Sequence, residues 1–330
     1  MSVPLPIPSL RSAGAILCFH GIASEPAPGQ GEAHLSLAEF KAFIGAARRM
    51  GQLVPLQDLV RRHFAGRSTA GLIAITADDA YASLLSEAGD YLAREAIPLT
   101  VFAVTQPLLT DARYWWDRVD DVFPRVPRAR WRAFENRCGL SEAYRQGQPA
   151  RYGPLRPFRQ WMLATHQGRW PAELEHELRQ LELEFGEGSR TAQRTMTLEE
   201  LARLAAFPAI DVGVHTLSHP VLPLLSDQEL AAEISGSYQV LREHFPKALP
   251  MLALPFGLFD CRTLAAARDA GMVATLTLAG TTLKRFADRD DLPRFCLCRS
   301  DRPRRLRARL TGFFDRKAAR RYPALPSATT

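Results

Sequence analysis

Two adjacent carboxylates and a pair of histidines are the residues of this 330-residue sequence best suited to chemistry. Asp78 and Asp79 follow one apolar run, and His215 and His219 follow another. Neighbouring carboxylates in a half-buried site repel each other, so a cation, a proton or solvent must relieve the pair. Two imidazoles and one carboxylate form the ligand set of many hydrolytic metal sites. The joint pattern therefore predicts a metal site with one acid left beside it.

Simpler structural roles stay open for each half of this pattern. One of the two aspartates could cap a helix predicted over residues 81–94. Histidines spaced by four residues lie on one face of a helical turn, which allows both imidazoles to reach one ion, but such pairs are often structural. The metal interpretation depends on the acids and the histidines meeting in space.

The chain alternates predicted strands with predicted helices. Residues 15–19 form an apolar run that delivers His20, and Leu72 to Ile75 suit a strand that is buried on both faces. Ser36 is placed to cap a helix that continues to about Met50. This alternation predicts an α/β fold with parallel strands joined by right-handed crossovers, and it puts the acids at the carboxyl end of a strand.

Five short motifs resemble those of the polysaccharide deacetylase (NodB-homology) family, a family of the carbohydrate esterase type. They are Leu-x-x-His at Leu17–His20, Thr-Ala-Asp-Asp-Ala-Tyr at Thr76–Tyr81, His-Thr-Leu-Ser-His-Pro at His215–Pro220, Leu-Pro-Phe-Gly at Leu254–Gly257 and Leu-Pro-Arg-Phe at Leu292–Phe295. The Leu-x-x-His motif comes first, as in circularly permuted members of the family. With the first strand, the motifs span residues 16–299, which is most of the chain.

The resemblance implies a distorted (β/α)7–8 barrel with a helical insertion and a metal-dependent hydrolase of carbon–nitrogen amide bonds. The implied reaction removes N-acetyl groups from an amino sugar in a glycan or a glycan precursor. The implied metal is a divalent ion, with zinc favoured and cobalt or nickel as alternatives. The implied roles are metal ligand for Asp79, His215 and His219, general base for Asp78, oxyanion-binding backbone N–H for Phe256 and general acid for His20.

The sequence departs from the family pattern near the predicted base. Leu252 to Leu254 stand where many members carry an arginine before the proline, and Ala77 and Ala80 replace the usual Phe and Gly. Arg294 could orient Asp78 in place of the missing arginine. These departures motivate an alternative, a catalytically impaired relative that only binds carbohydrate.

We predict one barrel domain over residues 1–330, with residues 105–194 as a helical insertion and residues 302–330 as a basic C-terminal helix and tail. Loops at the carboxyl ends of barrel strands carry substrate contacts, so the insertion could border the site. The aromatic stretch Tyr114 to Trp116 could stack against a sugar ring or form the insertion's own core, and the core interpretation is favoured.

The basic tail accounts for more than the net charge of +7, since residues 302–321 hold nine basic residues and one acid. An apolar face is predicted from the spacing of Leu306, Leu310, Phe313 and Phe314. Such a helix can lie peripherally on an anionic membrane, or its apolar face can close the bottom of the barrel. No recognised reading motif accompanies the charge, so specific nucleic-acid binding is not expected.

The sequence predicts a cytoplasmic protein. The basic tail allows an alternative, a peripheral position at the inner face of the membrane. No apolar run approaches the length of a membrane span, and the proline-broken N-terminus does not have the pattern of a secretory signal. The five cysteines include no Cys-x-x-Cys pair, which favours reduced thiols. Cys296 and Cys298 are interpreted as packing residues on one face of a strand that begins at Arg294.

Overall fold

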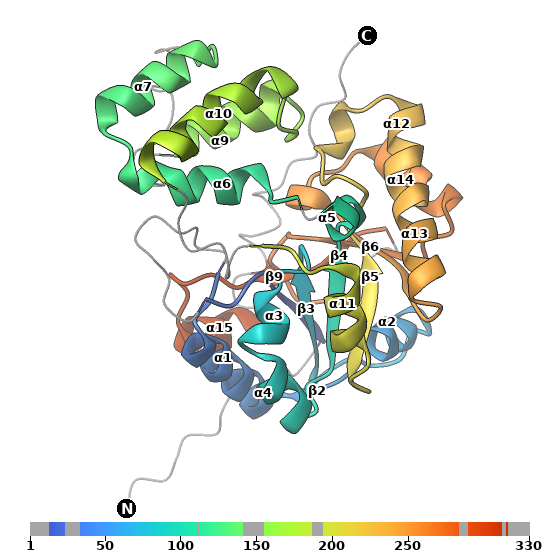
Figure 1. The fold of residues 1–330 in the computed structure, drawn as a ribbon. Helices are drawn as coiled ribbons and strands as arrows, with labels where there is room; N and C mark the ends of the chain where they lie inside the picture. Colours follow the sequence, from blue (N-terminus) through green and yellow to red (C-terminus); the bar gives the residue numbers. More distant parts are fainter. Residues whose placement is uncertain are drawn as a thin grey trace, which may run out of the picture.

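The computed structural model describes residues 13–23, 34–110, 112–140, 155–186, 194–283, 290–311 and 315. Its main strands are β1 (Ala15–Phe19), β3 (Leu72–Asp78), β4 (Leu99–Ala103), β5 (Ile210–Val214), β6 (Leu249–Ala253), β7 (Ala274–Thr277), β8 (Leu292–Pro293) and β9 (Phe295–Cys296). They form one parallel sheet in the order β8-β7-β6-β5-β4-β3-β1-β9, and the short β2 (Gln52–Leu53) pairs with β3 (Figure 1).

The two ends of this strand order meet in one short stretch of chain. β8 pairs with β7, and β9 pairs with β1 through Leu17 and Phe295. Only Arg294 separates β8 from β9. The stretch 292–296 therefore joins the last strand to the first and curls the sheet into a nearly closed barrel. The predicted distorted (β/α) barrel is confirmed.

Alternate side chains of the strands enter two separate apolar clusters. Ala15 and Leu17 of β1 belong to the larger cluster, whereas Ile16, between them in the chain, belongs to a second cluster with Phe102 and Leu276. Successive residues of a strand point to opposite faces of the sheet, so a strand that is buried on both sides must be apolar throughout. This requirement explains the continuous apolar runs of β1 and β3.

Helices cover the outer face of the strands. They are α1 (Leu37–Met50), α2 (Leu56–Phe64), α3 (Ser83–Ser86), α4 (Gly89–Arg94), α11 (Leu198–Ala205), α12 (Asp227–Ala231), α13 (Ser237–His244) and α14 (Cys261–Asp269). Ser36 caps α1 through the backbone N–H of Glu39, as predicted, and a π-helical turn η4 (Ala232–Gly236) joins α12 to α13. Neither of the paired aspartates caps a helix, because the residue before α3 is Ala82.

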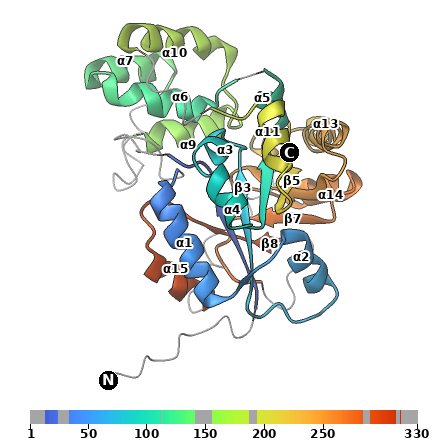
Figure 2. The ribbon, with the colours of Figure 1, turned by 60° about the horizontal axis from the view of Figure 1, so that its bottom comes forward.

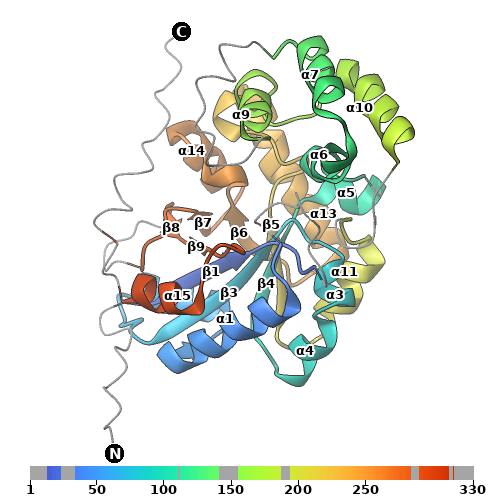
Figure 3. The same ribbon diagram turned by 90° about the vertical axis from the view of Figure 1, so that its left-hand side faces the viewer.

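The stretch between β4 and α11 contains a group of helices with its own apolar core. These are α5 (Thr105–Thr110), α6 (Trp115–Val122), the 3-10 helix η1 (Phe123–Arg125), α7 (Arg128–Arg137), α9 (Arg156–Thr165) and α10 (Ala172–Phe185). Phe134, Phe158 and Leu178 are buried in that core, and Arg118 bonds to Glu182 across α6 and α10. All but α5 gather beyond one end of the strands (Figures 1 and 3). The division of the chain into a barrel, an insertion and a tail remains our interpretation.

The basic helix α15 (Pro303–Leu310) packs onto the barrel through its apolar face. Leu306 and Leu310 are buried in the larger cluster, and α15 runs beside α1 (Figures 2 and 3). The apolar face of the described helix is therefore used in packing, and membrane contact through it finds no support. Phe313 and Phe314 lie outside the described residues. Among the helices that are described, none has both the length and the apolar character needed to cross a bilayer.

Candidate active site

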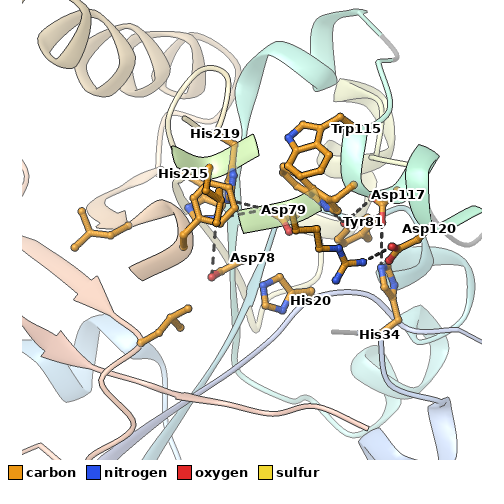
Figure 4. A pocket seen from close by; sticks show the side chains of 16 residues that line it. His20, His34, Asp78, Asp79, Tyr81, Trp115, Asp117, Asp120, His215 and His219 are labelled. Carbon is orange, nitrogen blue, oxygen red and sulfur yellow. Dashed lines mark hydrogen bonds and ion pairs between the residues drawn. The ribbon is translucent and has the colours of Figure 1, made fainter. Parts of the chain in front are cut away.

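The predicted site residues converge at the carboxyl ends of the strands (Figure 4). Asp78 is the last residue of β3, and His20 directly follows β1. His215 directly follows β5, and Phe256 lies in the 3-10 turn η5 (Pro255–Gly257) just beyond β6. In a parallel barrel these ends meet at one mouth, which is where barrel enzymes place their chemistry. All four side chains line one cavity of about 370 Å³.

Asp79 and the two histidines have the geometry of a metal ligand set. Oδ1 of Asp79 lies 3.4 Å from Nε2 of His215 and 3.6 Å from Nε2 of His219. Ligand bonds of about 2.0–2.1 Å in a tetrahedral arrangement separate ligand atoms by about 3.3 Å. The two distances from Asp79 are therefore close to those around a zinc-like ion, and all three ligand atoms lie within 4.8 Å of one another.

The hydrogen bonds of these ligands leave the atoms that face one another free for an ion. Nδ1 of His215 lies 2.8 Å from the carbonyl oxygen of Ala253; if it donates there, as a ligating histidine commonly does, Nε2 keeps a lone pair. Oδ1 of Asp79 is buried without a hydrogen-bond partner, a costly state that a cation would relieve. Burial lowers the pKa of His219 to about 3, so its ring is neutral and able to ligate. The residues fit a divalent metal ion.

The loop that carries the two histidines is not the helical turn that their spacing predicts. Residues 215–220 have no helical structure, and Thr216 and His219 have positive φ angles of 70° and 60°. The prediction was wrong because a spacing of four suits this loop as well as a helix. Both rings still reach Asp79.

Glu233 holds this loop in place and was not singled out from the sequence. It lies in η4, is 5% exposed, and its Oε2 accepts hydrogen bonds from the backbone N–H groups of Leu217 and Ser218 at 3.0 and 2.9 Å. Arg169 donates to Oε1 of the same carboxylate at 2.9 Å. An acidic residue on the buried face of an amphipathic helix was the available signal, since buried carboxylates need partners.

Asp78 is held away from the ligand cluster by a buried arginine. Nη1 and Nη2 of Arg294 donate to its two oxygens at 2.7 and 2.8 Å, which is the placement predicted for Arg294. Burial acts to raise the pKa of Asp78, but the guanidinium outweighs it and holds that pKa well below its usual range. Oδ2 nevertheless lies 4.0 Å from Nε2 of His215. Asp78 is thus an ionised acid beside the ligand cluster.

His20 lies in the same cavity and carries a proton near neutral pH. Burial acts to lower its pKa, but the nearby Cys296 sulfur and the carboxylates of Asp78 and Asp79 raise it to about 9. Its Nδ1 is buried and has no hydrogen-bond partner.

Aromatic residues of the insertion combine the two roles considered for them. Trp115 belongs to the insertion's apolar core, as the favoured interpretation expects, and it also lines the cavity. Trp116 lines the cavity as well, with its ring centroid 5.0 Å from that of His219 and 6.1 Å from that of Phe256. Tyr114 stacks on Trp116, and its hydroxyl donates to the backbone carbonyl of Asp79 at 2.9 Å.

A polar network that sequence reasoning missed fixes the far wall of the cavity. The hydroxyl of Tyr81 donates to Asp117 at 2.7 Å, and the indole N–H of Trp116 donates to that hydroxyl at 3.1 Å. Nε2 of His34 lies 3.6 Å from the same aspartate (Figure 4). The sequence offered no reason to select Asp117, because its partners come from distant parts of the chain.

Comparison with known proteins supports the family that the motifs indicate. Residues 167–275 match the family model described as polysaccharide deacetylase. That stretch contains both site histidines and Phe256, whereas the aspartate pair lies before it. A comparison with curated proteins finds no match.

Several solved deacetylases share the fold. The Streptococcus pyogenes deacetylase PplD, in complex with acetate, is 12% identical with a TM-score of 0.58, covering 90% of this chain and 97% of that one. IcaB from Ammonifex degensii is 17% identical with a TM-score of 0.56, covering 91% and 97%. The BpsB deacetylase domain from Bordetella bronchiseptica is 13% identical with a TM-score of 0.50, covering 89% and 98%.

At these identities the likeness to solved structures establishes the fold. Together with the family match, it confirms the resemblance to the polysaccharide deacetylase family that the motifs predict. The family match also agrees with the predicted enzyme class, a hydrolase acting on amide bonds.

Proposed function

We propose that this protein is a metal-dependent hydrolase that removes N-acetyl groups from an amino sugar in a glycan or glycan precursor. The observation that carries the proposal is the pair of aspartates with separate partners. Asp79 faces His215 and His219 with an unsatisfied oxygen, while Asp78 is held by Arg294 beside them. One carboxylate is thus available to a metal and the other is left free to move a proton.

Asp79, His215 and His219 would hold the ion, with zinc favoured by the nitrogen and oxygen ligands and cobalt or nickel as alternatives. When bound, such an ion polarises the amide carbonyl and lowers the pKa of a coordinated water toward about 7. Arg294 keeps the pKa of Asp78 low, so Asp78 is a weak base. A weak base needs an acidic proton donor, and a water whose pKa is lowered by a metal is such a donor. Oδ1 of Asp78 accepts a bond from Arg294 and keeps a second lone pair with which to accept a proton, whereas Oδ2 accepts from Arg294 and from the thiol of Cys18.

The remaining steps need an oxyanion donor and a general acid. In this proposal the backbone N–H of Phe256 donates to the carbonyl oxygen as negative charge develops there. His20, protonated near neutral pH, gives its proton to the departing nitrogen. The products would be acetate and a free amino sugar.

The cavity suits part of a carbohydrate. Its volume of about 370 Å³ lies within the range of small-molecule sites, about 300–1,000 Å³. Trp116 offers an aromatic face, and Asp117 and Asp120 bring carboxylates to the same wall from the insertion. Aromatic faces and carboxylates suit the apolar faces and hydroxyl groups of a sugar ring. The predicted cytoplasmic location remains a prediction.

The alternative of a binding protein without catalysis loses one of its motives. It rested on the missing arginine and on Ala77 and Ala80, and Arg294 bonds both oxygens of Asp78 in place of that arginine.

The test measures acetate release from a panel of N-acetylated sugars and oligosaccharides, together with metal content. We expect release that a chelator abolishes and zinc restores. Asp78→Asn should lose turnover and keep the metal, whereas Asp79→Asn should lose both. If Asp78→Asn lost the metal, the proposed division of labour between the two acids would be wrong. Binding of the panel without acetate release by metal-loaded protein would favour the binding alternative.

A further inference from the structure

A second cluster of side chains that could hold a metal includes His20, which lines the cavity, and two cysteines beside it. Cys18 of β1 and Cys296 of β9 are direct neighbours in the strand register, and His20 follows Cys18 by two residues. Residues two apart on an extended chain point to the same face. One ligand atom from each side chain, two sulfurs and a ring nitrogen, lie within 4.8 Å of one another.

This arrangement differs from the packing role that the sequence suggested for Cys296. Its strand ends at Cys296, so Cys298 does not share a strand face with it. Cys296 is only partly buried, whereas its neighbour Cys18 is completely buried. The Nδ1 atom of His20 is buried without a hydrogen-bond partner. Two thiols and an unsatisfied imidazole nitrogen in one place are the donors that thiophilic cations select.

We propose that Cys18, His20 and Cys296 form a second site, specific for thiophilic divalent cations such as zinc and cadmium. Two thiolates and one imidazole make a three-ligand set with an open fourth position. Any protons on the two thiols and on the ligating nitrogen of His20 must leave when the ion binds, so binding releases protons to solvent. The ion can enter from the cavity, which His20 lines.

The second site is separate from the Asp79 cluster but touches the same machinery. The thiol of Cys18 donates to Oδ2 of Asp78 at 3.3 Å, and that oxygen lies 4.0 Å from Nε2 of His215. Asp78 therefore stands between the two clusters, and its charge is already compensated by Arg294. An ion at the second site ligates the ring of His20 and removes it from proton transfer. This consequence rests on the proposed function: excess zinc inhibits, while the first equivalent activates.

Binding can be tested without any activity. Cobalt gives an intense thiolate-to-metal charge-transfer band only where sulfur ligates it, and the Asp79 cluster offers no sulfur. We expect the full chain to bind two cobalt ions and to show this band. Cys296→Ser should lose the band and one ion, and the matched control Cys298→Ser should keep both. Asp79→Asn should lose one ion and keep the band.

A second measurement needs no variant. Cadmium should slow the alkylation of Cys296 in the wild-type protein and leave that of the exposed Cys261 unchanged. If acetate release is found, excess zinc should inhibit the wild type, and Cys296→Ser should show less inhibition relative to its own rate at low zinc. A single bound cobalt ion without a charge-transfer band, or a band that survives Cys296→Ser, would overturn the second site. Failure to find acetate release would leave the cobalt result intact and would count against the proposed function alone.

Discussion

Replacing Arg294 with methionine should destabilise the protein in a way that depends on pH. Arg294 is 0% exposed, and its guanidinium bonds both oxygens of Asp78, the hydroxyl of Thr76 and the backbone carbonyl of Thr277. Removing one partner of such a buried pair costs about 3–5 kcal/mol, because the other charge is left uncompensated. We expect Arg294→Met to lose about that free energy of unfolding near neutral pH.

The sign of the pH dependence follows from the pKa of Asp78. In the wild type this pKa is depressed, so the Asp78–Arg294 pair stabilises the fold at pH values above about 3.9, the pKa of Asp78 in the unfolded chain. This stabilisation is lost as the pH falls through the lower pKa of Asp78 in the folded protein. Without Arg294, burial alone raises the pKa of Asp78. The variant is then penalised increasingly as pH rises above about 4, when the carboxylate must ionise inside the protein.

Urea unfolding of the metal-free protein at several pH values measures this difference. The gap between wild type and Arg294→Met should widen from about pH 4 toward neutrality, with a limiting slope of about 1.4 kcal/mol per pH unit. Arg294→Lys should fall between the two, since it keeps the charge but cannot form two parallel bonds. The double variant Asp78→Asn/Arg294→Met should recover part of the loss. A gap that stays constant with pH would mean that Arg294 acts by packing alone, and the reasoning would be refuted.

Three further predictions follow from contacts around the site. Glu233→Gln should weaken zinc binding about 10–100-fold, measured in competition with a chelator, because the carboxylate orients the histidine loop. The control Glu229→Gln, on the exposed side of the same helix, should leave the zinc affinity unchanged. Equal zinc affinities of the two variants would contradict this role of Glu233. Burial raises the pKa of Asp120 to about 6, so the wild type should lose stability as pH rises from about 4 to 6, and Asp120→Asn should remove that part of the slope. Leu306→Ala should lower the free energy of unfolding by about 2–5 kcal/mol, because this side chain is buried in the core. An unchanged free energy of unfolding would contradict packing of α15 on the barrel and would favour its binding to a membrane surface.

The barrel and the position of the acids could be predicted because both follow from simple rules. A strand buried on both faces must be apolar throughout, so the polar residues that end such runs mark the mouth of a parallel barrel. Asp78, His20 and His215 were placed correctly for this reason. The family motifs then assigned roles to them, and these roles remain predictions until activity is measured.

Contacts that depend on backbone detail could not be predicted. The left-handed conformations of Thr216 and His219 have no signal in residue type, since neither is a glycine or an asparagine. Glu233 reaches that loop from the π-helical turn η4, and no π-helical turn was predicted there. The aromatic stretch of the insertion was weighed as a choice between core and sugar contact, but one residue can serve both. Trp115 is buried in the insertion's core and also lines the cavity, as its neighbour Trp116 does.

Arg294 shows why a guess from position alone succeeded. The family pattern places an arginine before Pro255, and here the guanidinium comes from a stretch 216 residues after its partner Asp78. That stretch pairs with β7 through β8 and with β1 through β9, and Arg294 is the single residue between the two pairings. The residue that turns the strand from one neighbour to the other therefore also delivers a positive charge to the barrel interior. Closing the barrel and orienting the predicted base depend on the same residue, so a loss at Arg294 should be felt in stability and in turnover together.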